Sequence, residues 1–171
     1  KEGGKMVLKS KNDKQTYEFA SLLAKYIKGG DIIFLNGDLG AGKTTFVKGF
    51  AKAKNVKQTV TSPTFTLLKT YKTDSYTIVH VDAYRLEGSS FYELEDYLTN
   101  DNVIFIEWSN CLTNLETFKE HLEIKIKYLS KNQREFEIIP YGKRYEELVK
   151  EMFKKWIVYI LILQQNIYVS E

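Results

Sequence analysis

The residues best suited to chemistry lie in a glycine-rich loop, residues 37–45, with the sequence GDLGAGKTT. Gly37 and Gly42, followed at once by Lys43 and Thr44, have the spacing of the phosphate-binding loop of nucleoside-triphosphate enzymes. Glycines let backbone N–H groups converge on a phosphate because no Cβ stands in the way. In such a loop the lysine ammonium faces the β- and γ-phosphates, and the threonine hydroxyl ligates a Mg²⁺ ion that bridges them. The loop therefore predicts a site for a nucleoside triphosphate and Mg²⁺.

The segments on either side of the loop come in the order that such a site requires. Residues 31–35 (DIIFL) form a short apolar run typical of a buried parallel strand. After the loop, apolar residues recur at helical spacing: Phe46, Val47, Phe50, Ala51 and Ala53. Strand, loop and helix in this order direct the N-terminus of the helix toward the phosphates.

Composition indicates an ordinary globular protein. At 171 residues, with 43% hydrophobic and 27% charged residues, the chain has the size and balance of one folded domain. The formal net charge of +3 comes mainly from scattered lysines, which do not by themselves indicate nucleic-acid binding. The single cysteine, Cys111, excludes an internal disulfide framework. Neither a signal peptide nor an apolar run of membrane-spanning length is visible, so we expect a cytoplasmic location and no membrane contact.

Periodicity predicts an α/β fold similar to that of P-loop NTPases, with a mainly parallel central sheet, flanking helices and a C-terminal antiparallel hairpin. The other expected elements are a helix at 13–27, an extended segment at 59–68 broken by a turn at Pro63, a strand at 75–81, a short helix at 91–98, a strand at 103–106, a hairpin at 122–129 and 135–139, and a helix at 145–156. We expect an ATPase domain at 6–142, with a helix and apolar tail at 143–171 packed on the same domain or extending it.

Two carboxylates directly follow predicted strands. Asp82 comes after IVHV, and Glu107 comes after VIFI. Ligands of α/β proteins bind at the carboxyl edge of the sheet, so both acids are expected beside the loop. One would join Thr44 around Mg²⁺, and the other would align the attacking water or hold the metal through a bound water. The alternative for either acid is a structural cap of the following turn.

Other candidates have more than one interpretation. Residues 61–65 (TSPTF) are similar to a switch loop that senses the γ-phosphate, or form a threonine-rich edge strand. Arg85 could stabilise transition-state charge or form a structural ion pair. His80 is expected to be a packed or hydrogen-bonded imidazole. Trp108 could shield the site, contact a partner or belong to the core.

Missing motifs narrow the class of nucleotide enzyme. The guanine-reading Asn/Thr-Lys-x-Asp pattern of Ras-type GTPases is absent. The chain has only three arginines, and they form no arginine-rich lid of the kind that small-molecule kinases use. What remains is a compact ATPase with two acids at strand ends.

Four motifs in order give a more specific resemblance. They are GDLGAGKTT at 37–45, TSPTFTL at 61–67, HVDAYRL at 80–86 and IEW at 106–108. Over residues 8–139 the chain resembles the TsaE (YjeE) family, bacterial ATPases of tRNA threonylcarbamoyladenosine biosynthesis. The resemblance implies a slow or partner-stimulated ATPase that acts with the proteins TsaD and TsaB. That assembly modifies tRNAs that read ANN codons, and tRNA contact by this chain would be indirect.

The resemblance also implies roles by matching position. Thr44 and Glu107 would hold Mg²⁺, and Lys43, Thr64, Asp82 and Glu107 would serve catalysis. The expected nucleotide-binding residues are Asp13, Asp38, Leu39, Gly40, Ala41, Gly42, Lys43, Thr44, Thr45 and Arg134. Within this set, Asp13 and Arg134 would lie near the adenine base.

The chain departs from the family pattern in two places. It reads Glu107-Trp108-Ser109-Asn110 where the family commonly has Glu-Trp-Pro-Glu, which leaves the local turn open. The tail at 156–163 (WIVYILIL) is unusually apolar, and we expect it to pack on the core, with partner binding or a sticky end as alternatives. Two other functions remain open: a nucleotide-gated interaction module that needs no hydrolysis, and a small-molecule kinase.

Overall fold

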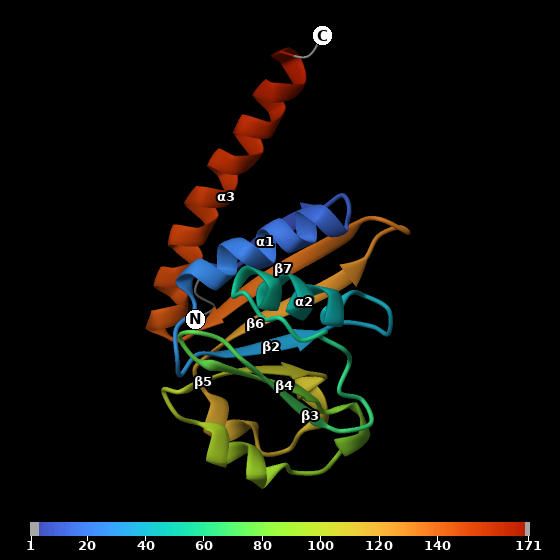
Figure 1. Ribbon diagram of the computed structural model, residues 1–171, viewed down its shortest axis with the longest axis vertical. Helices are drawn as coiled ribbons and strands as arrows, with labels where there is room; N and C mark the ends of the chain where they lie inside the picture. The colour runs from blue at the N-terminus through green and yellow to red at the C-terminus, as the bar shows by residue number, and fades with distance from the viewer. Residues whose placement is uncertain (1–3, 170–171) are drawn as a thin grey trace.

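A mixed sheet of seven strands forms the centre of the molecule (Figure 1). The computed structural model describes residues 4–169, and for residues 165–169 the backbone alone. The strands are β1 (Met6–Ser10), β2 (Ile32–Asn36), β3 (Leu68–Lys72), β4 (Thr77–Asp82), β5 (Asn102–Glu107), β6 (His121–Tyr128) and β7 (Arg134–Tyr141). The helices are α1 (Asp13–Tyr26), α2 (Lys43–Ala53) and α3 (Lys143–Val169), and the 3₁₀ helices are η1 (Tyr84–Leu86), η2 (Tyr92–Tyr97), η3 (Ser109–Cys111) and η4 (Leu115–Phe118).

The central strands of the sheet are parallel. The strand order is β1-β7-β6-β2-β5-β4-β3, in which β6, β2, β5 and β4 run in one direction. The hairpin of β6 and β7 is antiparallel, as are the edge pairs β1–β7 and β3–β4. The predicted fold class is confirmed: a mainly parallel sheet with flanking helices and a C-terminal antiparallel hairpin.

Alternating side chains of the sheet build a core on each face. Helices α1, α2 and α3 cover one face and the 3₁₀ helices lie on the other (Figure 1). On the helical side, the rings of Phe19, Phe46 and Phe136 meet with centroids 5.6–6.0 Å apart. On the other side, Phe34 packs edge-on against Phe118. Both faces of β2, β4 and β5 are therefore buried, which explains why these strands read as nearly continuous apolar runs.

Three sequence predictions need correction. The short helix expected at 91–98 is the 3₁₀ helix η2, in which only Leu94 is buried. In the segment at 59–68 the predicted turn at Pro63 is confirmed, because Leu67 N–H bonds to Pro63 O at 2.7 Å, but residues 59–67 form no strand, which excludes a threonine-rich edge strand there. The edge strands β1 and β3 were not predicted at all, because each has only five residues and its apolar run is short.

Helix α3 is longer than predicted and is anchored at its start. Arg144 pairs with Asp31 at 2.7 Å and donates to Tyr26 O at 2.8 Å. The Tyr145 hydroxyl accepts a hydrogen bond from Ile32 N at 2.9 Å. These contacts attach α3 to the beginning of β2, the strand that leads into the glycine loop.

The apolar tail only partly packs on the core. Trp156 is buried, and Tyr159 and Ile160 are half-buried against the main core. The expectation of packing is wrong for a second set of large side chains, which are 42–53% exposed: Ile157, Val158, Leu161 and Ile162. Residues 170–171, the end of the expected C-terminal segment, lie outside the described residues. Within residues 4–169, no helix combines the length and apolar character needed to cross a membrane.

Gly49 on α2 offers a test of the packing between α1 and α2. A Cβ there would lie 3.0 Å from Tyr17 Cα and 3.2 Å from Ala20 Cβ. Alanine favours a helix by up to about 1 kcal/mol over glycine, but crowding two helix backbones costs about 1–3 kcal/mol, so we expect Gly49→Ala to lower the free energy of unfolding by about 1–2 kcal/mol. Urea denaturation measures this change. The exposed neighbour Lys48 supplies the control Lys48→Ala, which should be neutral, and a stabilised Gly49→Ala protein would contradict the close approach.

Candidate nucleotide site

The glycine loop connects the end of β2 to the first residue of α2. Gly40 and Gly42 have φ of 78° and 110°, in the left-handed region that residues with a Cβ rarely adopt. A turn bonds Ala41 N to Asp38 O at 3.0 Å. Gly42 precedes α2 directly, so the unpaired N–H groups of the first helical turn are available to an anion at the loop.

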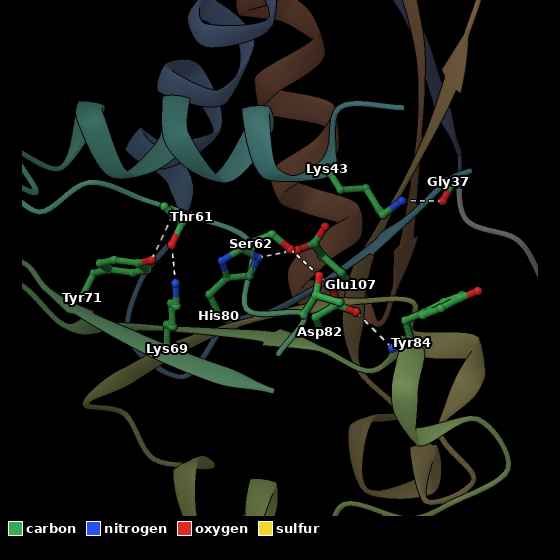
Figure 2. Close-up of polar contacts among 11 residues, drawn as sticks. Gly37, Lys43, Thr61, Ser62, Lys69, Tyr71, His80, Asp82, Tyr84 and Glu107 are labelled. Carbon is green, nitrogen blue, oxygen red and sulfur yellow. Dashed lines mark hydrogen bonds and ion pairs between the residues drawn. The ribbon is translucent and has the colours of Figure 1, made fainter. Parts of the chain in front are cut away.

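Lys43 lies inside the loop. Its ammonium donates to Gly37 O at 2.6 Å (Figure 2). It also donates to Asp38 O at 3.0 Å and lies 4.3 Å from the centre of the Trp108 ring. Burial lowers the pKa of Lys43, while Glu107, Asp82 and Asp38 oppose that shift. The neighbouring carboxylates thus favour the charged form of a largely buried lysine.

The two strand-end acids lie side by side. Asp82 is the register partner of Glu107 across the parallel pair β4–β5, and both are buried. Asp82 accepts hydrogen bonds from the Thr64 hydroxyl at 2.9 Å and from Tyr84 N at 3.0 Å. The side chain of Asp82 is therefore held by the segments before and after its own strand.

His80 binds Glu107 directly, a contact that the sequence interpretation did not identify. His80 Nε2 lies 2.6 Å from Glu107 Oε2, and His80 is fully buried (Figure 2). Within the described part of the chain, Nδ1 of His80 has no hydrogen-bond partner. With a proton on Nε2 the ring donates to the carboxylate, and Nδ1 is left without a partner among the described residues. The signal was present in the sequence, since His80 lies two residues before Asp82 and so faces the same side of β4.

The switch segment at 61–65 contacts the acids through one side chain. The Ser62 and Thr64 hydroxyls lie 2.7 Å apart, and Thr64 bonds to Asp82. Arg85 stacks over the Phe65 ring at 4.6 Å. Among the described residues Arg85 has no ion pair, which excludes the structural ion pair considered from the sequence.

These groups surround a cavity of about 460 Å³ at the carboxyl edge of the parallel strands. The predicted residues that line it are Leu39, Gly40, Gly42, Lys43, Thr44, Thr45, Thr64, Asp82 and Glu107. Ser62, Tyr84 and Trp108 complete the lining. The loop, the switch segment and the ends of β4 and β5 thus converge on one space.

A second cavity of about 540 Å³ lies on the other side of the loop. It is lined by Asp13, at the start of α1, and by Arg134, at the start of β7, and it shares Gly40, Gly42 and Thr45 with the first cavity. Arg134 Nε donates to Ala41 O at 2.8 Å, and its guanidinium stacks on Tyr128 at 4.5 Å. The structure therefore brings Asp13 and Arg134 to a space that adjoins the loop.

The oxygen donors of Thr44 and Glu107 suit a Mg²⁺ ion whose other ligands are phosphates and waters. Thr44 and Glu107 both line the first cavity, and His80 engages only Oε2 of Glu107. Residues 4–169 contain no group of three or more His, Cys, Asp or Glu side chains that could hold a metal. Mg²⁺ commonly takes one or two protein ligands and completes its shell with phosphates and waters, so the residues present fit this ion.

The turn after Glu107 is formed by Trp108 and Ser109. Trp108 adopts φ of 57°, and Ser109 then begins η3. The Ser109 N–H and hydroxyl both donate to Asn36 Oδ1, at 3.0 and 3.1 Å. Ser109 thereby ties the end of β5 to the end of β2, where the family pattern has proline.

A glycine loop between a parallel strand and a helix, at the carboxyl edge of the sheet, defines the class of P-loop NTPase-like proteins, which bind nucleotides. The particular family follows from sequence. The family model for "Threonylcarbamoyl adenosine biosynthesis protein TsaE" matches residues 10–136. The chain belongs to the TsaE family, whose members act in tRNA threonylcarbamoyladenosine biosynthesis.

Individual relatives agree with this assignment. The chain is 39% identical to the TsaE protein of Bacillus subtilis over 142 residues, which cover 82% of this chain and 89% of that protein. It is 45% identical to TsaE of Rickettsia felis, over 75% of this chain and 76% of that one. The crystal structure of YdiB from Bacillus subtilis is similar, with a TM-score of 0.74 and 34% identity, and the match covers 89% of this chain and 96% of that one.

The contact between His80 and Glu107 predicts energetic coupling. Replacing His80 by leucine leaves a buried carboxylate without its donor, which should lower the free energy of unfolding by about 1–3 kcal/mol. With Glu107→Gln as the second change, the double-mutant cycle should show a coupling energy of at least about 0.5 kcal/mol. Urea denaturation of the four proteins gives both quantities. Additive effects would show that the two side chains do not interact.

Proposed function

We propose that this chain is a Mg²⁺-dependent ATPase that works with TsaD and TsaB in the threonylcarbamoyladenosine modification of tRNA. The supporting observation is the convergence of Lys43, Thr44, Asp82 and Glu107 on one cavity beneath the glycine loop. Membership of the TsaE family supplies the pathway. The combination of a cation, a hydroxyl and two carboxylates is what phosphoryl transfer to water requires.

Each element has a defined part in binding. ATP with Mg²⁺ supplies an electrophilic γ-phosphate when bound. The N–H groups of the loop and of the first turn of α2 bind the phosphates, and Lys43 exchanges its two carbonyl partners for phosphate oxygens. Thr44 and Glu107 hold Mg²⁺, while His80 fixes the orientation of the Glu107 carboxylate. Asp13 and Arg134, in the adjoining cavity, bind the base side of the nucleotide.

Asp82 is the residue that we assign to the attacking water. Its carboxylate lies beside Glu107 and is oriented by Thr64 and by Tyr84 N. Thr64 belongs to the switch segment, so a displacement of that segment changes the orientation of Asp82. A partner protein that orders residues 61–65 would therefore stimulate the reaction, which accounts for a slow enzyme in isolation.

The proposed phosphate site predicts an effect of Lys43 on nucleotide affinity. Lys43→Ala removes the charge that faces the phosphates, and charge-assisted hydrogen bonds contribute about 1.5–3 kcal/mol, so the Kd for ATP should rise by at least about tenfold. Isothermal titration calorimetry measures the Kd. Lys48→Ala, an exposed lysine of the same helix, is the matched control and should retain full affinity. Unchanged binding by Lys43→Ala would rule out the proposed phosphate site.

Substitution of the two acids separates ATP hydrolysis from ATP binding. Asp82→Ala should lower kcat for phosphate release by about 10²-fold or more, because the attacking water loses its orienting group. Glu107→Ala should raise the Mg²⁺ concentration needed for half-maximal activity. Phosphate release is measured with and without TsaD and TsaB, with Glu116→Ala, at an exposed acid, as the control.

The same variants decide between hydrolysis and the two other functions. If a variant that binds ATP without hydrolysing it still supports full tRNA modification, the chain is a nucleotide-gated interaction module. Transfer of labelled γ-phosphate to a metabolite instead of water would identify a kinase.

A further inference from the structure

A cleft of about 760 Å³ opens between α1, α2 and α3, on the helical face of the molecule. The apolar part of its wall comes from all three helices and consists of Tyr17, Leu22, Ala53, Trp156, Val158, Tyr159 and Ile162. The C-terminal half of α3 extends past the other helices (Figure 1), and Val158 and Ile162 are 53% and 50% exposed. Gly49, whose lack of a side chain lets α1 and α2 approach closely, also lines the cleft.

The rim of the cleft is strongly basic. Four exposed lysines surround it: Lys14, Lys25, Lys52 and Lys155. In the described part of the chain none of them forms an ion pair with an acid of its own protein. The only acid in the lining is Glu18, so the cleft has a surplus of three positive charges.

Glu18 provides a second, independent observation. Its Oε2 is buried and has no hydrogen-bond partner within the described residues. An acceptor in this state is costly, because burial removes the water that would otherwise satisfy it. A donor from a bound molecule, such as a hydroxyl or an amide, would restore the missing bond.

We propose that this cleft is a docking site for an amphipathic, net-acidic helix of a partner protein. The apolar face of that helix would lie on Leu22, Trp156 and Tyr159, and its acidic residues would lie beside the lysines. The volume accepts two or three large side chains, which is the usual number of anchors when a helix binds in a groove. This inference does not rest on the proposed function, because of the two cavities at the glycine loop only the second shares a residue with the cleft, namely Lys14.

The positive charge of the cleft favours an acidic partner helix over a second copy of this chain. The exposed apolar part of α3 contains no acidic residue between Trp156 and Gln164, and Lys154 and Lys155 precede it. A second α3 in the cleft would therefore bring lysines toward lysines. A lipid surface would also suit basic and apolar residues, but a concave cleft between three helices fits a single helix better than a flat bilayer.

Two synthetic helical peptides of about 18 residues provide the test. Both have leucines at the same helical positions, and one has glutamates where the other has lysines. By fluorescence anisotropy with the full chain, the glutamate peptide should bind at least about tenfold more tightly than the lysine peptide, and high salt should reduce the difference.

Charge reversal makes the test specific to the cleft. Lys25→Glu combined with Lys52→Glu should weaken binding of the glutamate peptide at least about tenfold and strengthen binding of the lysine peptide. Lys72→Glu combined with Lys119→Glu, at exposed lysines outside the cleft, is the matched control and should change neither affinity. Unaltered unfolding midpoints in urea confirm that the variants are folded.

Several outcomes would overturn the proposal. They are equal affinity for the two peptides, failure of both to bind, and a charge-reversed protein that behaves like the control. Preferential binding to phosphatidylglycerol vesicles over the glutamate peptide would identify a lipid surface instead. A dimer in analytical ultracentrifugation that Val158→Asp dissociates would identify a second copy as the occupant.

Discussion

The parallel pairing of β2, β5 and β4 is the constraint on which the site depends. Leu35, the residue before the last of β2, pairs with Glu107, and Glu107 pairs with Asp82, so the ends of three strands lie in one row beside the glycine loop. A shift of one residue in this register would turn Glu107 to the opposite face of the sheet. The register is protected because both faces are packed: Phe105 contacts Phe50 on the helical side, and Ile106 is buried on the other. The geometry of the site is therefore a consequence of core packing.

That edge of the sheet gathers four buried ionisable groups: Lys43, His80, Asp82 and Glu107. Each has a partner: two backbone carbonyls for the lysine, the Glu107 carboxylate for the imidazole, and the Thr64 hydroxyl for Asp82. Each of these contacts matters for stability, because the low local dielectric penalises a buried polar group that loses its partner. The network also holds the carboxylates in place before a ligand arrives, so that little rearrangement is needed when charge develops. The same contacts thus maintain the fold and prepare the site.

Local sequence signals were sufficient to predict the central strands of the sheet, but they did not predict its edge strands. The loop at 37–45 and the apolar runs of β2 and β5 could be read directly, and the meeting of Asp82 and Glu107 follows from the rule that parallel strands end at one edge. β1 and β3 escaped prediction because each has only five residues and a short apolar run. The contact of Arg134 with the loop depends on how the hairpin of β6 and β7 lies beside β2, which no local pattern specifies. For the segment at 156–163 the sequence is apolar on all sides and has no period, so only tertiary packing decides that Trp156 is buried and Ile157 is exposed.

The arrangement of α1 and α2 shows how the cleft and the nucleotide site could influence each other. Helix α1 begins at Asp13, beside the second cavity, and its next turns pass Glu18 and Leu22 in the cleft. Helix α2 begins at Lys43 and contacts α1 closely at Gly49. Each helix thus runs without a break from the cleft to a cavity at the loop. Any displacement that a ligand imposes in the cleft would reach the loop through these two helix starts, and coupling between two binding equilibria must be equal in both directions. The close contact at Gly49 joins the two helices, because a Cβ there would already crowd the backbone of α1. A displacement of α1 along α2 would therefore also displace α2.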